Sequence, residues 1–249
     1  MGDPDSARVL VTGASQGIGK AIAAELASAH RFVLCVSRSK PDFQGSEGSD
    51  CADRITWNPL DLSNAAAVEE YAASLEPVAI NTLILSAVDY GEGGRHPASE
   101  ISASEWQRVV ATNLVGHCIL VSRLLPKLIQ NNPSGVIHVS SDVAVLPAAG
   151  RAAYAASKAG LHAMLRALAA EHESNGLRTY QLIPTFQSVT EGIRRRRPAN
   201  FDFSSYADPT LIADIVGKIV SPAGDPLPGG TYLIHQDGSL TPYPEPDSL

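Results

Sequence analysis

Short apolar segments alternate with helical segments along most of the 249-residue chain. The apolar segments are hydrophobic at nearly every position, and the segments between them have helical composition and spacing. Strands that are apolar throughout are typical of a parallel sheet that helices cover on both faces. No linker separates the segments, so we expect one α/β domain over residues 1–249. The predicted strands span residues 8–12, 32–37, 81–87, 135–141, 177–183 and 230–236, and the predicted helices span residues 19–30, 65–75, 104–129 and 154–174.

The charge of the chain argues against two classes of partner. The formal net charge is −7, which leaves no broad basic surface of the kind that nucleic acid or an anionic membrane attracts. We therefore expect neither nucleic acid nor a membrane as a partner, and no metal site is predicted. A small molecule is the expected ligand.

The cysteines and the N-terminus bear on the compartment. Cys35, Cys51 and Cys118 form no CxxC pair and are odd in number, which favours reduced thiols. The apolar runs are short and the N-terminus is acidic, so neither a transmembrane segment nor a signal peptide is predicted. Gly2 and Ser6 match a loose myristoylation pattern in a poor context. The sequence predicts a cytoplasmic protein.

A glycine-rich stretch, TGASQGIG, directly follows the first predicted strand and opens the first predicted helix. Glycine at positions 13, 17 and 19 would let a pyrophosphate approach backbone N–H groups and the positive end of the helix. A tight turn without a ligand is the alternative. The position after strand one favours a dinucleotide site.

The end of the second predicted strand bears on the choice of dinucleotide. A carboxylate there would bind both ribose hydroxyls of NAD(H), but the sequence reads VSRSK, with Ser37 and Arg38. A guanidinium suits the 2′-phosphate of NADP(H) instead. The alternative is an ordinary surface arginine, and Gln16 in the glycine loop adds no second cation. We predict that NADP(H) is preferred over NAD(H).

Tyr154 and Lys158 stand one helical turn apart on the same face of an alanine-rich helix. A packed tyrosine beside a solubilising lysine would explain them, and so would a phenol whose proton an adjacent ammonium makes available. Other motifs decide between these interpretations: the glycine loop, Asp61-Leu62, Asn113 in TNLVG, and Ser141 in VSSD, thirteen residues before Tyr154. In order and spacing the chain resembles the short-chain dehydrogenase/reductases from Arg8 to about Ser239.

The resemblance implies a single-domain Rossmann fold with a doubly wound, mostly parallel sheet of about seven strands. It also implies a homotetramer, or a homodimer, assembled through the long helices. The implied catalytic residues are Asn113, Ser141, Tyr154 and Lys158. The implied cofactor-binding residues are Gly13, Ser15, Gln16, Gly17, Ile18, Gly19, Ser37, Arg38, Asp61, Leu62, Ser86, Ala87, Tyr154, Lys158, Pro184 and Gln187.

The implied mechanism is chemically consistent. Hydride transfer to a carbonyl carbon builds negative charge on the oxygen, which needs a proton donor and a second hydrogen bond. Tyr154 would give the proton, Ser141 would hold the oxygen, and Asn113 would help to seat a relay water. Lowering a phenol pKa from ~10 to ~7 requires about 4 kcal/mol, which Lys158 and the oxidised cofactor would supply.

Three short segments depart from the family pattern. Residues 85–88 read LSAV where an Asn-Asn-Ala-Gly turn is usual, Pro184-Thr185 replaces a Pro-Gly pair, and HQDGSL lacks one glycine. We expect these departures to alter cofactor contacts and to preserve the fold.

The predicted substrate region is a lid over about residues 186–208, with residues 240–249 as a C-terminal tail. The predicted pocket residues are Tyr90, Val143, Phe186 and Tyr206, and the aromatic side chains favour an apolar or aromatic ketone. The arginine run 194–197 would meet an anionic substrate or carrier protein, or would simply be solvated. Asn132 and Asn175 stand where carrier-binding ketoreductases have basic residues.

The sequence thus predicts an NADPH-dependent carbonyl reductase acting on a small ketone. A 3-oxoacyl-thioester reductase and an NADP-dependent alcohol dehydrogenase are the enzymatic alternatives. A nucleotide-sensing regulator is the non-enzymatic one, but a sensor would not need the matched proton donor that Tyr154 provides.

Overall fold

The structure is a computed structural model, and it describes residues 8–43, 53–92, 95–221 and 227–244. Cys51, the Gly2 and Ser6 pattern, and the last five residues of the predicted tail lie outside the described residues.

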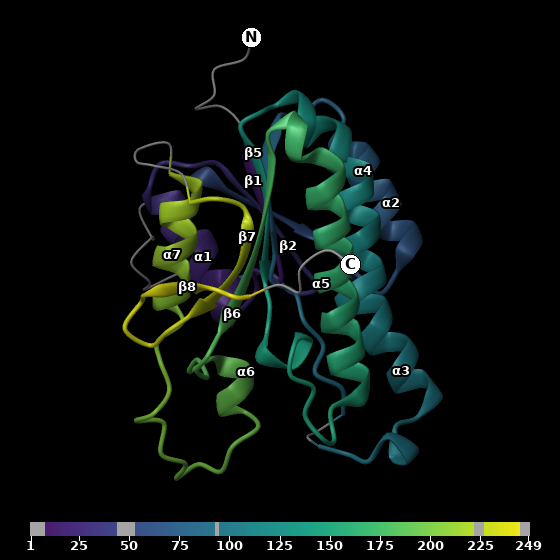
Figure 1. The fold of residues 1–249 in the computed structure, drawn as a ribbon, viewed down its shortest axis with the longest axis vertical. Helices are drawn as coiled ribbons and strands as arrows, with labels where there is room; N and C mark the ends of the chain where they lie inside the picture. Colours follow the sequence, from purple (N-terminus) through teal and green to yellow (C-terminus); the bar gives the residue numbers. More distant parts are fainter. Residues whose placement is uncertain (1–7, 44–52, 93–94, 222–226, 245–249) are drawn as a thin grey trace.

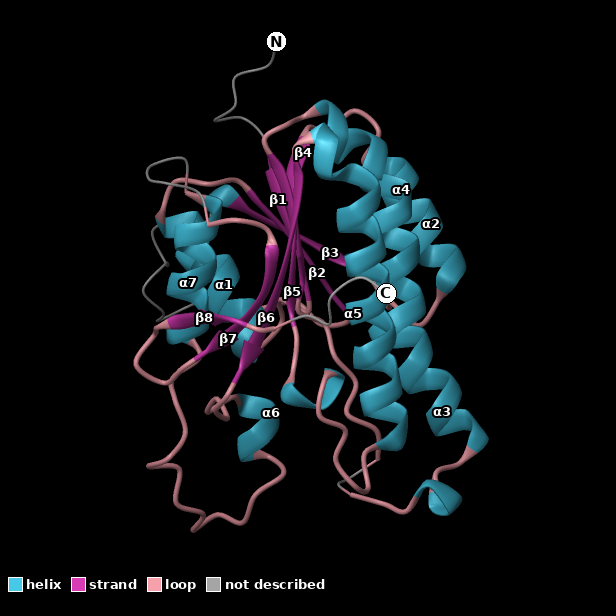
Figure 2. Cartoon of the chain, in the orientation of Figure 1, coloured by secondary structure: helices cyan, strands magenta, loops and turns pink. Residues whose placement is uncertain are grey.

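The strands and helices alternate in the order that the sequence predicts (Figures 1 and 2). The strands are β1 (Arg8–Thr12), β2 (Val33–Ser37), β3 (Ile55–Pro59), β4 (Ile80–Leu85), β5 (Ser134–Val139), β6 (Leu177–Pro184), β7 (Gly230–Ile234) and β8 (Leu240–Pro242). The helices are α1 (Gly17–Ser28), α2 (Ala65–Ser74), α3 (Ala103–Val110), α4 (Gly116–Gln130), α5 (Ala152–His172), α6 (Glu191–Arg194) and α7 (Thr210–Val220). β3 and α7 are absent from the sequence-based prediction.

The described strands form one sheet in the order β3-β2-β1-β4-β5-β6-β7-β8. Every neighbouring pair is parallel except β7 and β8, which are antiparallel. The prediction of about seven strands is therefore one strand short. The start of the predicted tail folds back along β7 as β8, through a turn in which Asp237 accepts hydrogen bonds from the backbone N–H and hydroxyl of Ser239. The single α/β Rossmann-like domain is confirmed.

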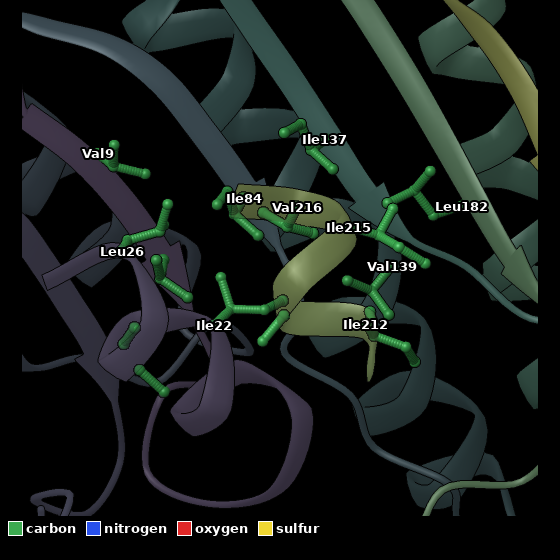
Figure 3. Close-up of a cluster of buried hydrophobic side chains, with 14 of the residues drawn as sticks. Val9, Ile22, Leu26, Ile84, Ile137, Val139, Leu182, Ile212, Ile215 and Val216 are labelled. Carbon is green, nitrogen blue, oxygen red and sulfur yellow. The ribbon is translucent and has the colours of Figure 1, made fainter. Parts of the chain in front are cut away.

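The sheet is covered on both faces, as its uniformly apolar strands require. Helices α1 and α7 lie on one face, and α2, α4 and α5 lie on the other (Figures 1 and 2). Figure 3 shows side chains of α1 and α7, such as Ile22 and Val216, packed against Val9, Ile84 and Ile137 of the strands. All five of these side chains are buried.

The predicted helix 104–129 is a single helix from Ala103 to Gln130 that contains one π-helical segment, Ala111–Val115, between α3 and α4. Its length and mean hydropathy would suffice to cross a membrane. One face of this helix packs in the core, where Leu120, Leu124 and Leu128 are fully buried in the cluster that also contains residues of β4 and β5.

Candidate active site

A cavity of about 620 Å³ opens at the carboxyl ends of the central strands. Strand order reverses between β1 and β4, which is where α/β proteins of this architecture bind ligands. Most of the predicted site residues line the cavity: Gly13, Ser15, Gln16, Gly17, Ile18, Gly19, Ser37, Arg38, Asp61, Leu62, Ser86, Ala87, Tyr90, Tyr154 and Lys158. The other predicted residues are absent from its wall: Asn113, Ser141, Val143, Pro184, Phe186, Gln187 and Tyr206.

The glycine loop packs closely on the end of β4. Gly13 has φ +72°, and a Cβ atom there would lie 2.6 Å from Ala87 Cα. The hydroxyl of Thr12 accepts hydrogen bonds from the backbone N–H groups of Ser86 (2.9 Å) and Ala87 (3.1 Å). This hydroxyl therefore holds the LSAV segment, whose sequence departs from the family pattern.

His117 completes the arrangement around Thr12. Its Nε2 lies 3.1 Å from Thr12 Oγ1 and its Nδ1 lies 3.0 Å from the carbonyl oxygen of Asn113. Burial lowers the pKa of His117 to about 4, so the ring is neutral at pH 7 and one nitrogen carries the proton. We assign that proton to Nδ1, which faces a carbonyl acceptor. Nε2 is then an acceptor that shares the single proton of the Thr12 hydroxyl with the Ile84 carbonyl oxygen (3.3 Å). No motif in the sequence marks His117 as a site residue.

Asn113 lies in the π-helical segment and is buried. Its Oδ1 accepts from the backbone N–H of Asp89 (2.7 Å), and its Nδ2 donates to the carbonyl oxygen of Asp89 (2.7 Å) and to Ser157 Oγ (3.0 Å). The Asp89 carboxylate in turn binds Arg108 (2.8 Å). The side chain of Asn113 therefore clamps the segment after β4 to α5. Its predicted part in a water relay stays a prediction.

Tyr154 is buried on α5, and its ring centroid lies 5.1 Å from that of Tyr90. Burial is the largest cause of a raised pKa of the Tyr154 phenol, and Tyr90 and, to the smallest extent, Asp142 also raise it, whereas a hydrogen bond with Ser141 and the charge of Arg151 lower it. The predicted lowering by Lys158 is therefore not present in the chain by itself. A raised pKa keeps the proton on the phenol, which is the state that a proton donor needs.

Ser141 lies close enough to Tyr154 to influence its pKa, but its hydroxyl is engaged elsewhere. Oγ donates to Asp142 Oδ1 at 2.8 Å. The same carboxylate oxygen accepts from the backbone N–H of Val143 (2.9 Å). Val143, a predicted substrate residue, is buried beside Tyr154 rather than on the cavity wall.

Lys158 lines the cavity and is almost completely buried, with only 3% of its surface exposed. Its Nζ donates to Val139 O (2.9 Å) and lies 3.1 Å from His138 Nε2. Desolvation lowers its pKa to about 7. An ammonium has three N–H donors, so one remains for a ligand in the cavity. His138, which no sequence motif marks, is thus a direct partner of a predicted catalytic residue.

The buried lysine predicts a pH dependence of stability. The pKa of an unfolded lysine is about 10.4 and that of folded Lys158 is about 7, so between these pH values the unfolded chain binds more protons. Raising the pH from 7 to 9 should therefore favour wild type over Lys158→Met by about 2 kcal/mol in the free energy of unfolding. Urea denaturation at several pH values measures the difference. Substitution of the exposed Lys218 by methionine is the matched control, and a pH-independent difference for Lys158→Met would contradict the lowered pKa.

Ser37 and Arg38 reach the outer end of the cavity, but only Arg38 has a side chain that is available there. The Ser37 hydroxyl donates to Ser39 O (2.8 Å) and accepts from the indole N–H of Trp57 (3.0 Å). These bonds fix the turn after β2. The guanidinium of Arg38 is exposed and lines the cavity.

The predicted lid segment, residues 186–208, contains α6 and lies below the lower end of β6 in Figure 1. Two of its side chains contact the glycine loop. Glu191 Oε2 accepts from the backbone N–H of Gly17 (2.8 Å), and the guanidinium of Arg195 donates to Gln16 Oε1. Neither Glu191 nor Arg195 was expected to contact the glycine loop.

The lid aromatics fold mainly against each other and not into the cavity. Phe201, Phe203 and Tyr206 are in mutual edge contact, with centroids 4.9 to 5.8 Å apart. Phe186 packs against the hydrophobic core near α1 and α7. Of the four predicted substrate residues, only Tyr90 lines the cavity. Phe186 and Tyr206 therefore do not form the aromatic cavity wall that the sequence predicts.

Comparison with known proteins identifies similar chains. A family model described as short chain dehydrogenase matches residues 7–200. A 3-oxoacyl-[acyl-carrier-protein] reductase, FabG, of Rickettsia bellii is 28% identical over 250 residues, covering 96% of this chain and 99% of that protein. The NADP-dependent 3-hydroxy acid dehydrogenase YdfG of Escherichia coli K12 is 28% identical over 183 residues, covering 74% of this chain and 73% of that protein.

Solved structures share the architecture. The crystal structure of a metagenomic short-chain oxidoreductase (SDR) in complex with NADP superposes with a TM-score of 0.73 at 26% identity. The match covers 94% of this chain and 99% of the other.

Proposed function

Since this chain belongs to the short-chain dehydrogenase/reductase family of oxidoreductases, we propose that it is an NADPH-dependent carbonyl reductase in which Tyr154 donates the proton. One observation carries the proposal: Tyr154 and Lys158 line the same cavity as the glycine loop and Arg38. A phenol, an ammonium and a dinucleotide-type loop thus face one space. The NADP complex and the NADP-dependent relative support the choice of cofactor.

The residues around the cavity fit a nicotinamide dinucleotide. The cavity runs from Arg38 to Tyr154, and its volume lies in the range of small-molecule sites. The glycine-loop N–H groups would hold the pyrophosphate. Arg38 would hold the 2′-phosphate, and the third N–H of Lys158 would hold a ribose hydroxyl. When bound, the reduced cofactor supplies the hydride.

The chain supplies the proton and the alignment. The Tyr154 hydroxyl would donate its proton to the carbonyl oxygen as the hydride reaches the carbon, which yields an alcohol and a phenolate. The Ser141 hydroxyl would turn from Asp142 to hydrogen-bond the same oxygen. The protonated form of Lys158 would stabilise the phenolate. The pKa of Lys158 is about 7 in the chain alone. The negative charge of the cofactor phosphates would favour the protonated form of Lys158.

The direct test is NADPH consumption by the purified protein with diketones, quinones, aromatic ketones, oxo acids and 3-oxoacyl thioesters, with NADH in parallel. We expect turnover with at least one carbonyl class and a preference for NADPH. Tight NADPH binding with no turnover on any class would favour a nucleotide sensor instead. An NADP-dependent alcohol dehydrogenase would show faster turnover in the oxidative direction.

A 3-oxoacyl-thioester reductase is the second candidate. The Rickettsia bellii relative, which aligns with this chain over nearly its full length, is named a 3-oxoacyl-[acyl-carrier-protein] reductase. The carrier-facing positions do not favour it. Asn132 Nδ2 donates to Asn175 O (3.1 Å), so two amides stand where a carrier protein would need cations.

We further propose that the protein works in the cytoplasm as a homotetramer or homodimer. The free thiols Cys35 and Cys118 support a reducing compartment. The exposed Val115 on the long helix supports an apolar contact face. Light scattering of the purified protein measures the assembly.

The contact between Glu191 and Gly17 leads to a prediction about cofactor affinity. The Glu191 carboxylate accepts a hydrogen bond from the backbone N–H of Gly17, in the loop that would bind the pyrophosphate. Its negative charge would also repel the phosphates. Glu191→Gln should therefore tighten NADPH binding by about 3- to 5-fold. Titration calorimetry measures the Kd, with the exposed Glu70→Gln on α2 as the control for a lost surface charge. Unchanged or weaker binding in Glu191→Gln would show that the carboxylate does not compete with the cofactor.

A further inference from the structure

The arginine run 194–197 lacks partners of opposite charge. The chain has 26 acidic residues against 19 basic ones, yet none of these four guanidiniums forms an ion pair with a carboxylate of the described residues. Arg195 and Arg196 line the cavity. Clustered cations without counter-ions beside a reaction site are suited to an anionic ligand.

Aromatic rings hold three of these guanidiniums in place. A guanidinium stacked on a ring keeps its full charge and leaves the N–H groups at its edge free to bind an oxyanion in a bidentate manner. The stacked pairs are Arg194 on Phe203 (4.9 Å from guanidinium carbon to ring centroid), Arg196 on Tyr90 (4.3 Å) and Arg197 on Phe201 (5.0 Å).

Arg196 is the stacked arginine that faces the reaction centre. Its guanidinium lies over Tyr90, whose ring lies 5.1 Å from the ring of Tyr154. All three residues line one cavity. A single ring thus separates a cation from the proton donor, which is a spacing that one small molecule can bridge.

Of the carboxylates near this position, Asp142 beside Tyr154 accepts hydrogen bonds from Ser141 and Val143 and has no cation partner among the described residues. The others are engaged by a cation or by the backbone. The carboxylates of Asp89 and Glu92 pair with Arg108 at 2.8 and 3.6 Å, and Glu191 is bound to the glycine loop. A second cation, Arg151, acts on the same rings. Desolvation raises the pKa of Tyr90, although 40% of this residue is exposed, and the charges of Arg196 and Arg151 together with a hydrogen bond from Arg196 oppose that rise.

We propose that Arg196, stacked on Tyr90, binds the carboxylate of an oxo acid whose carbonyl group is reduced at Tyr154. This inference rests on the proposed reductase function and names its substrate class. The reaction converts an oxo acid, NADPH and one proton into a hydroxy acid and NADP⁺, and the carboxylate itself is unchanged. The apolar ketone that the aromatic composition suggests is thereby replaced, because only Tyr90 among the predicted substrate residues reaches the cavity.

The test compares acids with their methyl esters. Acetoacetate, 4-oxopentanoate and 5-oxohexanoate place the carboxylate at increasing distance from the carbonyl, and each ester keeps the carbonyl but removes the charge. We expect wild type to prefer the best acid over its ester by at least about tenfold in kcat/KM. Arg196→Gln should lower kcat/KM for that acid by about 30-fold, mainly through KM, and change the value for the ester by less than about threefold.

Two variants separate recognition from general damage. Arg194→Gln removes a stacked arginine that does not line the cavity, so it should leave kcat/KM unchanged for both the acid and its ester. Arg196→Lys keeps the charge but loses the planar fork, so it should retain only part of the preference for the acid. Arg196 is exposed, and circular dichroism checks that its variants remain folded.

Each outcome bears on the proposal separately from the reductase function. Turnover of neutral ketones or esters, with equal effects of Arg196→Gln on acid and ester, would overturn the oxo-acid inference and leave the reductase. Preference for a 3-oxoacyl-CoA over every acid would also overturn it, since phosphate would then be the anion. If no compound is turned over, the Kd of the oxo acids decides: loss of binding in Arg196→Gln supports the site, and no binding to wild type overturns it.

Discussion

Replacement of Tyr154 by phenylalanine should abolish carbonyl reduction while leaving NADPH binding within about twofold of wild type. The substitution removes one oxygen and keeps a ring of the same shape on a buried helix, so packing against Val143 and Ala155 is retained. What is lost is the proton donor, which contributes about 10²- to 10⁴-fold in enzymes of this chemistry. We expect the loss in kcat to lie toward the upper end, because Tyr90, the other tyrosine that lines the described cavity, is not on the helix that carries Lys158.

Tyr90→Phe is the matched control. Its ring lies against that of Tyr154, so it tests whether loss of any phenol at the site has the same effect. It should keep at least about a third of the wild-type kcat. Calorimetry with NADPH and thermal unfolding establish that each variant is folded and binds the cofactor. More than about a tenth of wild-type kcat in Tyr154→Phe would disprove the assigned role.

The strands that the sequence predicts well are those buried on both faces. β2, β4 and β5 are buried at every position, so their sequences are mostly apolar and stand out from the helices and loops around them. β3 lies at the edge of the sheet and has an exposed face, and its sequence, ITWNP, does not stand out. β8 has three residues and ends in proline. β8 pairs with β7 only because the turn at Asp237 and Ser239 reverses the chain. The three residues of β8 carry no strand pattern of their own from which this pairing could be predicted.

The parts of the site that are local in sequence were predictable, and those that depend on distant partners were not. The glycine loop and the one-turn spacing of Tyr154 and Lys158 follow from adjacent residues. His138 contacts Lys158 across twenty positions and His117 contacts Thr12 across 105. A histidine inside an apolar strand is a signal of a buried partner, because an isolated polar ring there would be costly. That signal identifies the histidine but not its partner.

The lid segment was the least predictable part. Its aromatic composition suggested a pocket lining, but Phe201, Phe203 and Tyr206 bury their surface against each other. Composition cannot distinguish rings that face a ligand from rings that pack together, since both reduce apolar exposure. The cations stacked on these rings are the more informative feature, because their charge has no partner within the described chain.

Arg38→Ala should weaken NADPH binding by about 10- to 150-fold and change NADH binding by less than about twofold. The two cofactors differ only in the 2′-phosphate, and a charge-assisted bond to such a group contributes about 1.5 to 3 kcal/mol. Arg38 is the predicted residue that can make this bond, since the Ser37 hydroxyl is already committed to Ser39 and Trp57.

Comparison of both cofactors in each variant gives the prediction its control. Any general damage to the glycine loop would weaken both cofactors equally, so the ratio of the two Kd values isolates the phosphate. Lys40→Ala removes a neighbouring exposed cation that does not line the cavity, and it should shift the ratio by less than about threefold. Arg38→Asp should reverse the preference, because a carboxylate repels the phosphate and accepts hydrogen bonds from the free ribose hydroxyls. An equal effect of Arg38→Ala on both cofactors would mean that this guanidinium is only a surface charge and that the preference for NADPH has another origin.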